Sequence, residues 1–180
     1  MKGLLLLERV ISGGQCGADQ AALRAARQVG IETGGIAPPG WATSEGPQQE
    51  LLMGYGLKEG EGQGAAGYVM RSKQNVDDAE ATLVFRAQAS AGSDKTIEYC
   101  LSGRWKTPTF ALGQADAVQN ALGHRPVIIV QHLTPAAQEA VCSFLREHQV
   151  RILNVAGHRA VEGVPGWAAA VEVFLIKVFS

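Results

Sequence analysis

The feature that most constrains the fold is a glycine-rich segment near the N-terminus, placed between an apolar run and a helix-forming run. Val10 and Ile11 end the apolar run, and residues 13–17 (GGQCG) follow shortly after it. Residues 18–27 are rich in alanine, leucine and arginine, which favour helices, and Gly30 is a typical helix stop. The pattern predicts a strand, a tight turn and a helix.

Short β-rich runs alternate with helix-forming runs along the rest of the chain. Later strands are expected at residues 81–85, 107–112, 126–130 and 151–155. Later helices are expected at residues 75–80, 94–101, 115–122 and 165–178, with one more that begins at 134–135. This alternation predicts an α/β fold, Rossmann-like, with a mostly parallel sheet and helices on both faces. A length of 180 residues fits a single ligand-binding domain that covers 1–180.

Glycine is over-represented, with 22 residues where average usage would give roughly 13. Residues 34–40 are expected to form turns. In residues 54–67, six of fourteen positions are glycine and few side chains are apolar. Two interpretations of that segment stay open: a solvated connection, or a mobile lid over a binding site.

Charge and cysteine content exclude several classes of protein. The net charge of −1 gives no basic surplus for nucleic acid or an anionic membrane. The three cysteines lie far apart, which argues against a disulfide framework and a zinc site and fits a reducing cytosol. The leucines at 4–7 are too few for a secretory signal, and no run is long enough to cross a membrane. We therefore expect a cytoplasmic protein that binds neither nucleic acid nor membrane.

Small residues recur just after three of the predicted strands, in residues 13–17, 91–94 and 156–159. In an open α/β sheet such turns meet at one edge, where ligands bind. Glycines allow close backbone approach, and the free N–H groups of a helix N-terminus attract anionic oxygens. The turns therefore predict a site for a phosphate-bearing small molecule. The candidate binding residues are Gly13, Gly14, Gln15, Cys16, Gly17, Gly92, Ser93, Thr96, Gly157 and Arg159.

Individual side chains in these turns have two interpretations each. Arg159 is the cation best placed for bidentate contact with phosphate, or else a surface arginine. Ser93 fits a helix cap as well as an anion ligand, and Cys16 is either a small turn residue or a thiol activated by the helix N-terminus. His158 is the only histidine in a candidate turn. Trp41 is interpreted as a packing residue, with stacking on a planar ring as the alternative.

Two familiar phosphate-binding motifs are absent from the first turn. No Gly-Lys-Ser/Thr follows residues 13–17, so the segment is not a P-loop. G-x-G-x-x-G is also missing, and no acidic partner for a ribose follows, so it is not a nicotinamide fingerprint.

Four segments together resemble the molybdenum cofactor carrier proteins, a circularly permuted branch of the Lonely-Guy-like Rossmann superfamily. They are residues 10–19 (VISGGQCGAD), 33–35 (TGG), 75–78 (NVDD) and 153–159 (LNVAGHR). The matches run from residue 10 to about 175 in the family's order. Cys16 and Gln20 stand where the family usually has threonine and arginine.

The resemblance implies a homo-oligomer, possibly a tetramer, that holds the molybdenum cofactor (molybdopterin) as cargo for transfer or storage. The pterin dithiolene holds the molybdenum, so no protein metal ligand is expected. An alternative is a nucleoside monophosphate phosphoribohydrolase of the Lonely-Guy-like type, in which Glu98 and an arginine would act at the ribosyl bond. A third is a nucleotide-sensing module. We expect a non-catalytic carrier in which Glu98 is a solvated helix charge.

Overall fold

The structure is a computed structural model that describes residues 5–108, 113, 115–120 and 123–180. Most of the strand expected at 107–112 lies outside the described residues, and so does Leu4 of the N-terminal leucine run. Residues 107 and 108 are described and belong to no strand.

A seven-stranded sheet forms the centre of the molecule, in the order β5-β2-β1-β9-β6-β8-β7. Its strands are β1 (Arg9–Ser12), β2 (Glu32–Ala37), β5 (Leu57–Glu59), β6 (Ala81–Phe85), β7 (Ala117–Asn120), β8 (Val127–Val130) and β9 (Ile152–Gly157). All pairings are parallel except that of the edge strand β7 with β8. Strands β3 (Ala42–Thr43) and β4 (Gly46–Pro47) form a separate small hairpin. The prediction of a mostly parallel sheet is confirmed.

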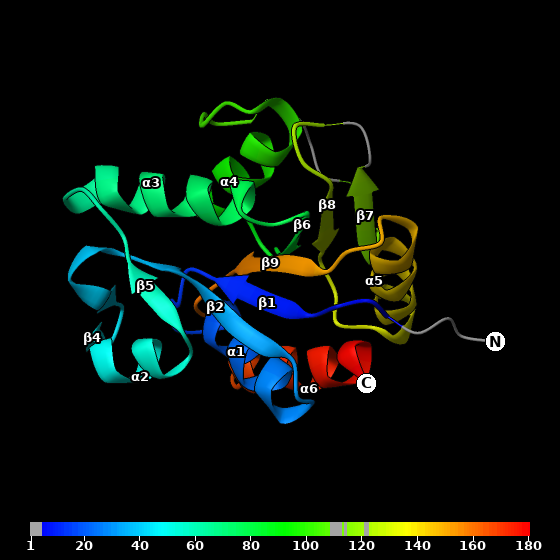
Figure 1. The fold of residues 1–180 in the computed structure, drawn as a ribbon. Coiled ribbons are helices and arrows are strands. Elements are labelled where there is room, and N and C mark those ends of the chain that lie inside the picture. The colour runs from blue at the N-terminus through cyan, green and yellow to red at the C-terminus, as the bar shows by residue number, and fades with distance from the viewer. Residues whose placement is uncertain (1–4, 109–112, 114, 121–122) are drawn as a thin grey trace.

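Helices cover both faces of the sheet, as predicted (Figure 1). They are α1 (Ala18–Gln28), the short η1 (Pro39–Trp41), α2 (Gln49–Gly54), α3 (Gly64–Asp77), α4 (Ala91–Ser102), α5 (Pro135–Glu147) and α6 (Trp167–Phe179). Helices α1, α5 and α6 lie on one face, and α3 and α4 lie on the other. Parallel strands covered in this way are buried on both sides, which explains the apolar runs of β6 and β8.

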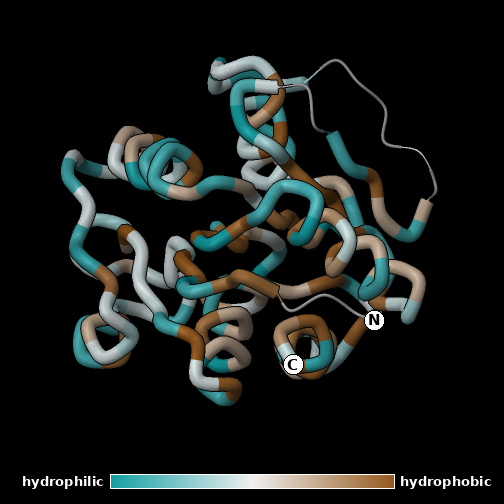
Figure 2. Tube along the Cα trace, turned by 45° about the vertical axis from the view of Figure 1, so that its right-hand side comes forward, coloured by the Kyte–Doolittle hydropathy of each residue, from teal (hydrophilic) through white to brown (hydrophobic). Residues whose placement is uncertain are grey.

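The core alternates between the two faces along strand β6. Leu83 and Phe85 join the large cluster under α1, α5 and α6, whereas Val84 joins the cluster under α3 and α4. Phe85 is fully buried and makes edge-to-face contacts with Trp167 at 6.4 Å and Phe174 at 5.6 Å between ring centroids. Figure 2 shows that α6 is hydrophobic along much of its length, in agreement with its position against this core.

Side-chain caps fix the starts of two helices. The Thr134 hydroxyl accepts a hydrogen bond from the N–H of Ala137 at 3.1 Å, and Pro135 occupies the first helical position of α5, as predicted. The Ser90 hydroxyl accepts from the N–H of Ser93 at 3.5 Å and caps α4. Helix α4 therefore begins at Ala91, three residues before the expected start, and Ser90 rather than Ser93 is its cap.

The turn expected at residues 34–40 was largely wrong, because residues 32–37 form strand β2 between β1 and β5. The glycines of β2 allow this strand to pack closely against its neighbour β1. Gly35 has a φ of +123°, and a Cβ built on it would lie 2.1 Å from the carbonyl oxygen of Ser12. Pairing on both sides stabilises a segment whose own composition favours a turn.

The expectation of one loop over residues 54–67 was also wrong. The segment contains the end of α2, the strand β5 and the first turn of α3. Leu57 of β5 is buried against Leu23 and Leu52, and this packing orders the segment despite its glycines. The helix expected at 75–80 is the C-terminal part of α3, which ends at Asp77.

The helix expected at residues 115–122 was wrong where the structure describes it. Residues 117–120 form strand β7, which pairs antiparallel with β8, while residues 121 and 122 lie outside the described residues. The strand expected at 151–155 is β9, which continues to Gly157 because it pairs with β6 up to Phe85.

Candidate functional site

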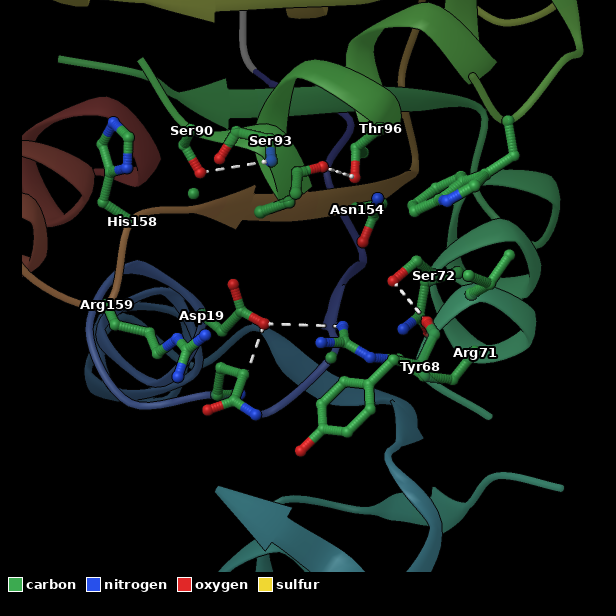
Figure 3. A pocket seen from close by; sticks show the side chains of 18 of the residues that line it. Asp19, Tyr68, Arg71, Ser72, Ser90, Ser93, Thr96, Asn154, His158 and Arg159 are labelled. Carbon is green, nitrogen blue, oxygen red and sulfur yellow. Dashed lines mark hydrogen bonds and ion pairs between the residues drawn. The ribbon is translucent and has the colours of Figure 1, made fainter. Parts of the chain in front are cut away.

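The three small-residue turns follow strands that are neighbours in the sheet. The turn at residues 13–17 follows β1. The other two predicted turns lie partly in regular elements: residues 156 and 157 end β9 and the turn proper begins at 158, while residues 91–94 form the first turn of α4, which residues 86–90 connect to β6. Because these strands are parallel, their carboxyl ends meet at one edge, where a cavity of about 410 Å³ lies between the turns and helix α3. Figure 3 shows the side chains of this pocket. Its volume is in the range of small-molecule sites.

The structure brings seven of the ten predicted binding residues to the pocket wall. They are Gly13, Gln15, Gly92, Ser93, Thr96, Gly157 and Arg159. Gly14, Cys16 and Gly17 do not line it. Cys16 is buried in the turn, where the side-chain amide of Gln20 lies 3.9 Å from its sulfur.

Several of these glycines serve chain packing rather than the cavity. A Cβ on Gly14 would lie 2.8 Å from Leu57, and Gly14 has a φ of +72°. A Cβ on Gly17 would lie 2.3 Å from the carbonyl oxygen of Arg159, and one on Gly157 would lie 2.7 Å from that of Phe85. The lack of a side chain lets the turn after β1 approach β5 and the turn after β9, and lets the end of β9 approach the end of β6, so these glycines support the site without lining the cavity with side chains.

The start of helix α4 differs, because its glycine has free space around it. A Cβ on Gly92 would meet no atom within 4 Å. Thr96 donates its hydroxyl to the carbonyl oxygen of Gly92 at 3.1 Å. Asp94 in the same turn pairs with Arg86 at the end of β6, which holds the helix start against the sheet. Ser90 already accepts from the N–H groups of Ser93 and Asp94, so the N–H of Gly92 is the backbone donor of this helix start best suited to receive an anion.

Helix α3 provides a pocket wall that sequence reasoning missed. Its Tyr68, Arg71, Ser72 and Asn75 line the cavity, at a spacing that places them on one helix face. That polar periodicity was a usable signal, but the glycines before residue 68 hid the helix. Asn75 also fixes the neighbouring strand, since its amide donates to and accepts from the backbone of Ile36 at 3.0 and 2.8 Å.

Arg71 lies directly over the first glycine of the turn after β1. A Cβ on Gly13 would be 1.4 Å from Nη1 of Arg71, so only glycine accommodates this guanidinium. The side chain is 12% exposed, and its Nε is buried without a hydrogen-bond partner. Its only ion pair among the described residues is with Asp19, at 3.8 Å. Figure 3 shows Arg71 and Asp19 side by side at the bottom of the pocket.

Asp19 lies in the first turn of helix α1 and is almost completely buried. Its Oδ2 accepts a hydrogen bond from the N–H of Gln15 at 3.3 Å. Burial raises the pKa of Asp19 to about 6, although Arg71 and, more weakly, Arg159 act in the opposite direction. Burial likewise lowers the pKa of Arg71. The pocket therefore contains a carboxyl group that titrates close to physiological pH.

The two residues after Gly157 differ in role. His158 is buried, its Nε2 accepts the N–H of Gln88 at 3.2 Å, and burial lowers its pKa, which favours the neutral ring. Its carbonyl oxygen receives the indole N–H of Trp167 at 3.2 Å, which ties the turn to α6. Arg159 is exposed and lines the pocket, and Figure 3 places it on the far side of Asp19 from Arg71.

Glu98 and two tryptophans are the other residues considered for a role at the site. Glu98 was expected to be solvated, which was wrong: it is buried, with its carboxylate 2.9 Å from the Ser102 hydroxyl and 3.6 Å from Lys106 Nζ. It does not line the pocket. Trp41 packs in a buried cluster, in agreement with its interpretation as a packing residue. Trp105 packs against the cluster under α4 and also lines the pocket.

A second cavity of about 410 Å³ is lined by residues of strands β1, β2 and β5, and none of the predicted site residues lines it. In the described part of the chain, no cluster of three or more histidine, cysteine or acidic side chains could hold a metal ion. Within the same residues, no helix is long and apolar enough to cross a membrane.

Comparison with known proteins identifies the family. The sequence profile of the circularly permutated YpsA SLOG family matches residues 10–179. The chain belongs to this family. A crystal structure of a candidate molybdenum carrier protein from Syntrophus aciditrophicus is similar, with 24% sequence identity and a TM-score of 0.70. The match covers 99% of this chain and 98% of the other, and it confirms the Rossmann-like fold of the family along the whole length. A comparison with curated proteins gave no significant match.

Proposed function

We propose that this protein is a carrier that binds the molybdenum cofactor, a phosphate-bearing pterin, in the pocket at the ends of β1, β9 and β6. The observation that carries the proposal is the convergence of three strand ends on one cavity that offers the first turn of helix α4 and two arginines. The name of the similar Syntrophus protein, a candidate molybdenum carrier, supports a molybdenum-related cargo.

The pocket residues fit such a cargo in chemistry and size. The backbone N–H of Gly92, the hydroxyl of Ser93 and the guanidinium of Arg159 are suited to a phosphate group. The rings of Tyr68 and Trp105 in the same wall are suited to a planar heterocycle. The cofactor brings its own dithiolene ligands for molybdenum, so the protein has to hold the organic part alone.

The phosphoribohydrolase alternative needs Glu98 at the ligand's sugar. The Glu98 carboxylate instead faces Ser102 and Lys106 and stands outside the pocket wall. This position favours a carrier over that hydrolase. A carrier releases no free base from nucleoside monophosphates. The proposal also includes a cytoplasmic location and a homo-oligomer, and light scattering measures the size of the oligomer.

Native mass spectrometry of the purified protein with anaerobically prepared molybdenum cofactor tests the proposal. One cofactor per chain is expected, and Arg159→Ala is expected to weaken binding by roughly ten-fold or more, since a charge-assisted contact is lost. Lys177→Ala, at an exposed position of α6, is the matched control and should bind like the wild type. Absence of cofactor binding, or equal binding by Arg159→Ala, would overturn the proposal.

A further inference from the structure

We propose that Arg71 binds an anionic group of the ligand at the Gly13 end of the pocket, and that Asp19, its present counter-charge, takes up a proton when this anion binds. The inference uses the pocket of the proposed function and adds a specific anion ligand and a proton to it. No covalent bond forms or breaks. One proton passes from solvent to the Asp19 carboxylate as the anion enters.

The first support is that Arg71 lacks hydrogen-bond partners; its contacts are the ion pair with Asp19 and the ring of Tyr68, whose centroid lies 5.9 Å from the guanidinium carbon. No hydrogen bond joins its guanidinium to another described residue, and its Nε is buried without a partner. A guanidinium carries five donors, and leaving the buried Nε–H unpaired costs free energy that an oxyanion would recover. Gly13 provides the space that keeps the group at the pocket wall.

The second support is that the pair with Asp19 is loose. The closest atoms, Nη1 of Arg71 and Oδ2 of Asp19, are 3.8 Å apart, which is too long for a hydrogen bond. Oδ2 receives its hydrogen bond from Gln15 instead. Asp19 therefore compensates the charge of Arg71 without occupying its donors, and an entering anion meets free N–H groups beside a carboxylate of its own sign.

The groups around Asp19 determine whether its carboxylate takes up a proton when an anion enters beside it. The charged side chains that act on it are Arg71 from α3 and Arg159 from the turn after β9, and backbone N–H groups of the turn after β1 complete its contacts. Its pKa already stands at about 6 because of burial. A negative charge nearby favours the neutral form further, so binding near neutral pH should draw a proton onto Asp19.

The same pocket contains another titratable group, and the test must distinguish its contribution to the pH dependence from that of Asp19. His158 lies in the wall, and its protonation at low pH would also favour anions. Its Nε2 already accepts the N–H of Gln88, so protonation would break that contact. Any pH dependence that survives the removal of the Asp19 carboxylate reports on His158.

Sulfate is the probe, because its own charge is constant over the pH range used. Its affinity is measured by isothermal titration calorimetry at about pH 5 and about pH 8, in two buffers of different ionisation enthalpy that reveal proton uptake. The variants are Asp19→Asn, Arg71→Met and Arg71→Lys. Lys73→Met, on the same helix with its ammonium over Tyr99, is the matched control. Circular dichroism checks the fold of each.

For the wild type we expect sulfate to bind at least about ten-fold more tightly at the lower pH, with up to one proton taken up per anion at the higher pH. Asp19→Asn should bind tightly at both pH values without that uptake. Arg71→Met should lose binding, Arg71→Lys should keep part of it, and Lys73→Met should match the wild type.

Three results would overturn the inference: no sulfate binding by the folded wild type, binding that Arg71→Met retains, or weaker binding by Asp19→Asn. The last would mean that the Asp19 carboxylate is needed to hold Arg71 in its place and does not compete with the anion. These failures are distinguishable from failure of the proposed function, because sulfate contains no pterin. A protein that binds sulfate as described but no cofactor would retain this inference and lose only the carrier proposal.

Discussion

The guanidinium of Arg71 fills the space that a side chain on Gly13 would need, with Nη1 only 1.4 Å from the position of that Cβ. The first glycine of the turn after β1 is therefore matched to an arginine of helix α3, some sixty residues later in the chain. Its φ is not positive, so the need for glycine comes from this side chain rather than from the backbone. The relationship links the turn to the anion site proposed at Arg71.

Gly13→Ala should separate binding from folding. The new methyl group displaces the end of a flexible side chain, so we expect the protein to fold while Arg71 leaves its place and sulfate affinity falls by roughly ten-fold. Gly92→Ala is the matched control for stability, since free space surrounds that position. Calorimetry with sulfate and urea unfolding of both variants check this. A Gly13→Ala protein with wild-type affinity would contradict the assigned role of Arg71.

Gly17→Ala should act in the opposite way, through the fold. Gly17 has a φ of +90°, and a Cβ there would lie 2.3 Å from a backbone oxygen of the turn after β9. Neither strain can relax by a side-chain movement, so we expect a loss of more than about 2 kcal/mol in the free energy of unfolding. Urea denaturation measures it, with Gly92→Ala again as the control. A loss below about 0.5 kcal/mol would show that the two turns are not packed as described.

The pH dependence of stability should reveal Asp19. The pKa of this group is about 6 in the folded protein, compared with 3.8 for an unperturbed carboxyl. Between these values the folded state holds a proton that the unfolded chain releases, so stability falls as the pH rises from about 4 to about 6. Two pKa units correspond to roughly 3 kcal/mol.

The measurement is the difference in unfolding free energy between the wild type and Asp19→Asn across that pH range. The variant has no carboxyl at this position, so it should lack this part of the decline. Using the difference removes the contribution of His158, whose lowered pKa acts with the opposite sign in both proteins. Parallel pH profiles would show that Asp19 titrates normally.

Phe85→Ala should cost far more stability than a substitution at the surface of the molecule. Phe85 is fully buried at the end of β6 and contacts both Trp167 and Phe174. Removing the ring leaves a cavity between the sheet and α6, with an expected loss of about 3–5 kcal/mol. Val173→Ala, at an exposed position of α6, is expected to change stability by less than about 1 kcal/mol. Thermal and urea unfolding of the two variants provide the comparison.

Local signals predicted the elements that carry their own start and stop residues. The turn after β1, helix α1 and helix α5 were found in this way, because a glycine turn or a threonine-proline cap is visible in a few residues. Strands β2 and β7 were missed for the converse reason. Their pairing with β1, β5 and β8 orders them, and that pairing joins residues far apart in the chain.

The site was predicted from its turns but not from its opposite wall. Gln63 precedes α3 without a side-chain cap, and glycines surround it, so the helix that carries Arg71 had no local start signal. The polar spacing of Tyr68, Arg71 and Asn75 becomes informative once the helix is known. The packing roles of Gly14 and Gly17 depend on distant strands and could not be predicted from the turn alone.

Binding of the phosphorylated pterin in the pocket between the turns is tested most directly by a ligand-induced thermal shift. Cofactor at about 100 times its dissociation constant should stabilise the fold by about 2.7 kcal/mol, which for this size raises the melting temperature by roughly 5–10 °C. Arg159→Ala and Gly13→Ala should each lose much of that shift, while Lys177→Ala should retain it. A full shift in both pocket variants, or none in the wild type, would contradict the account.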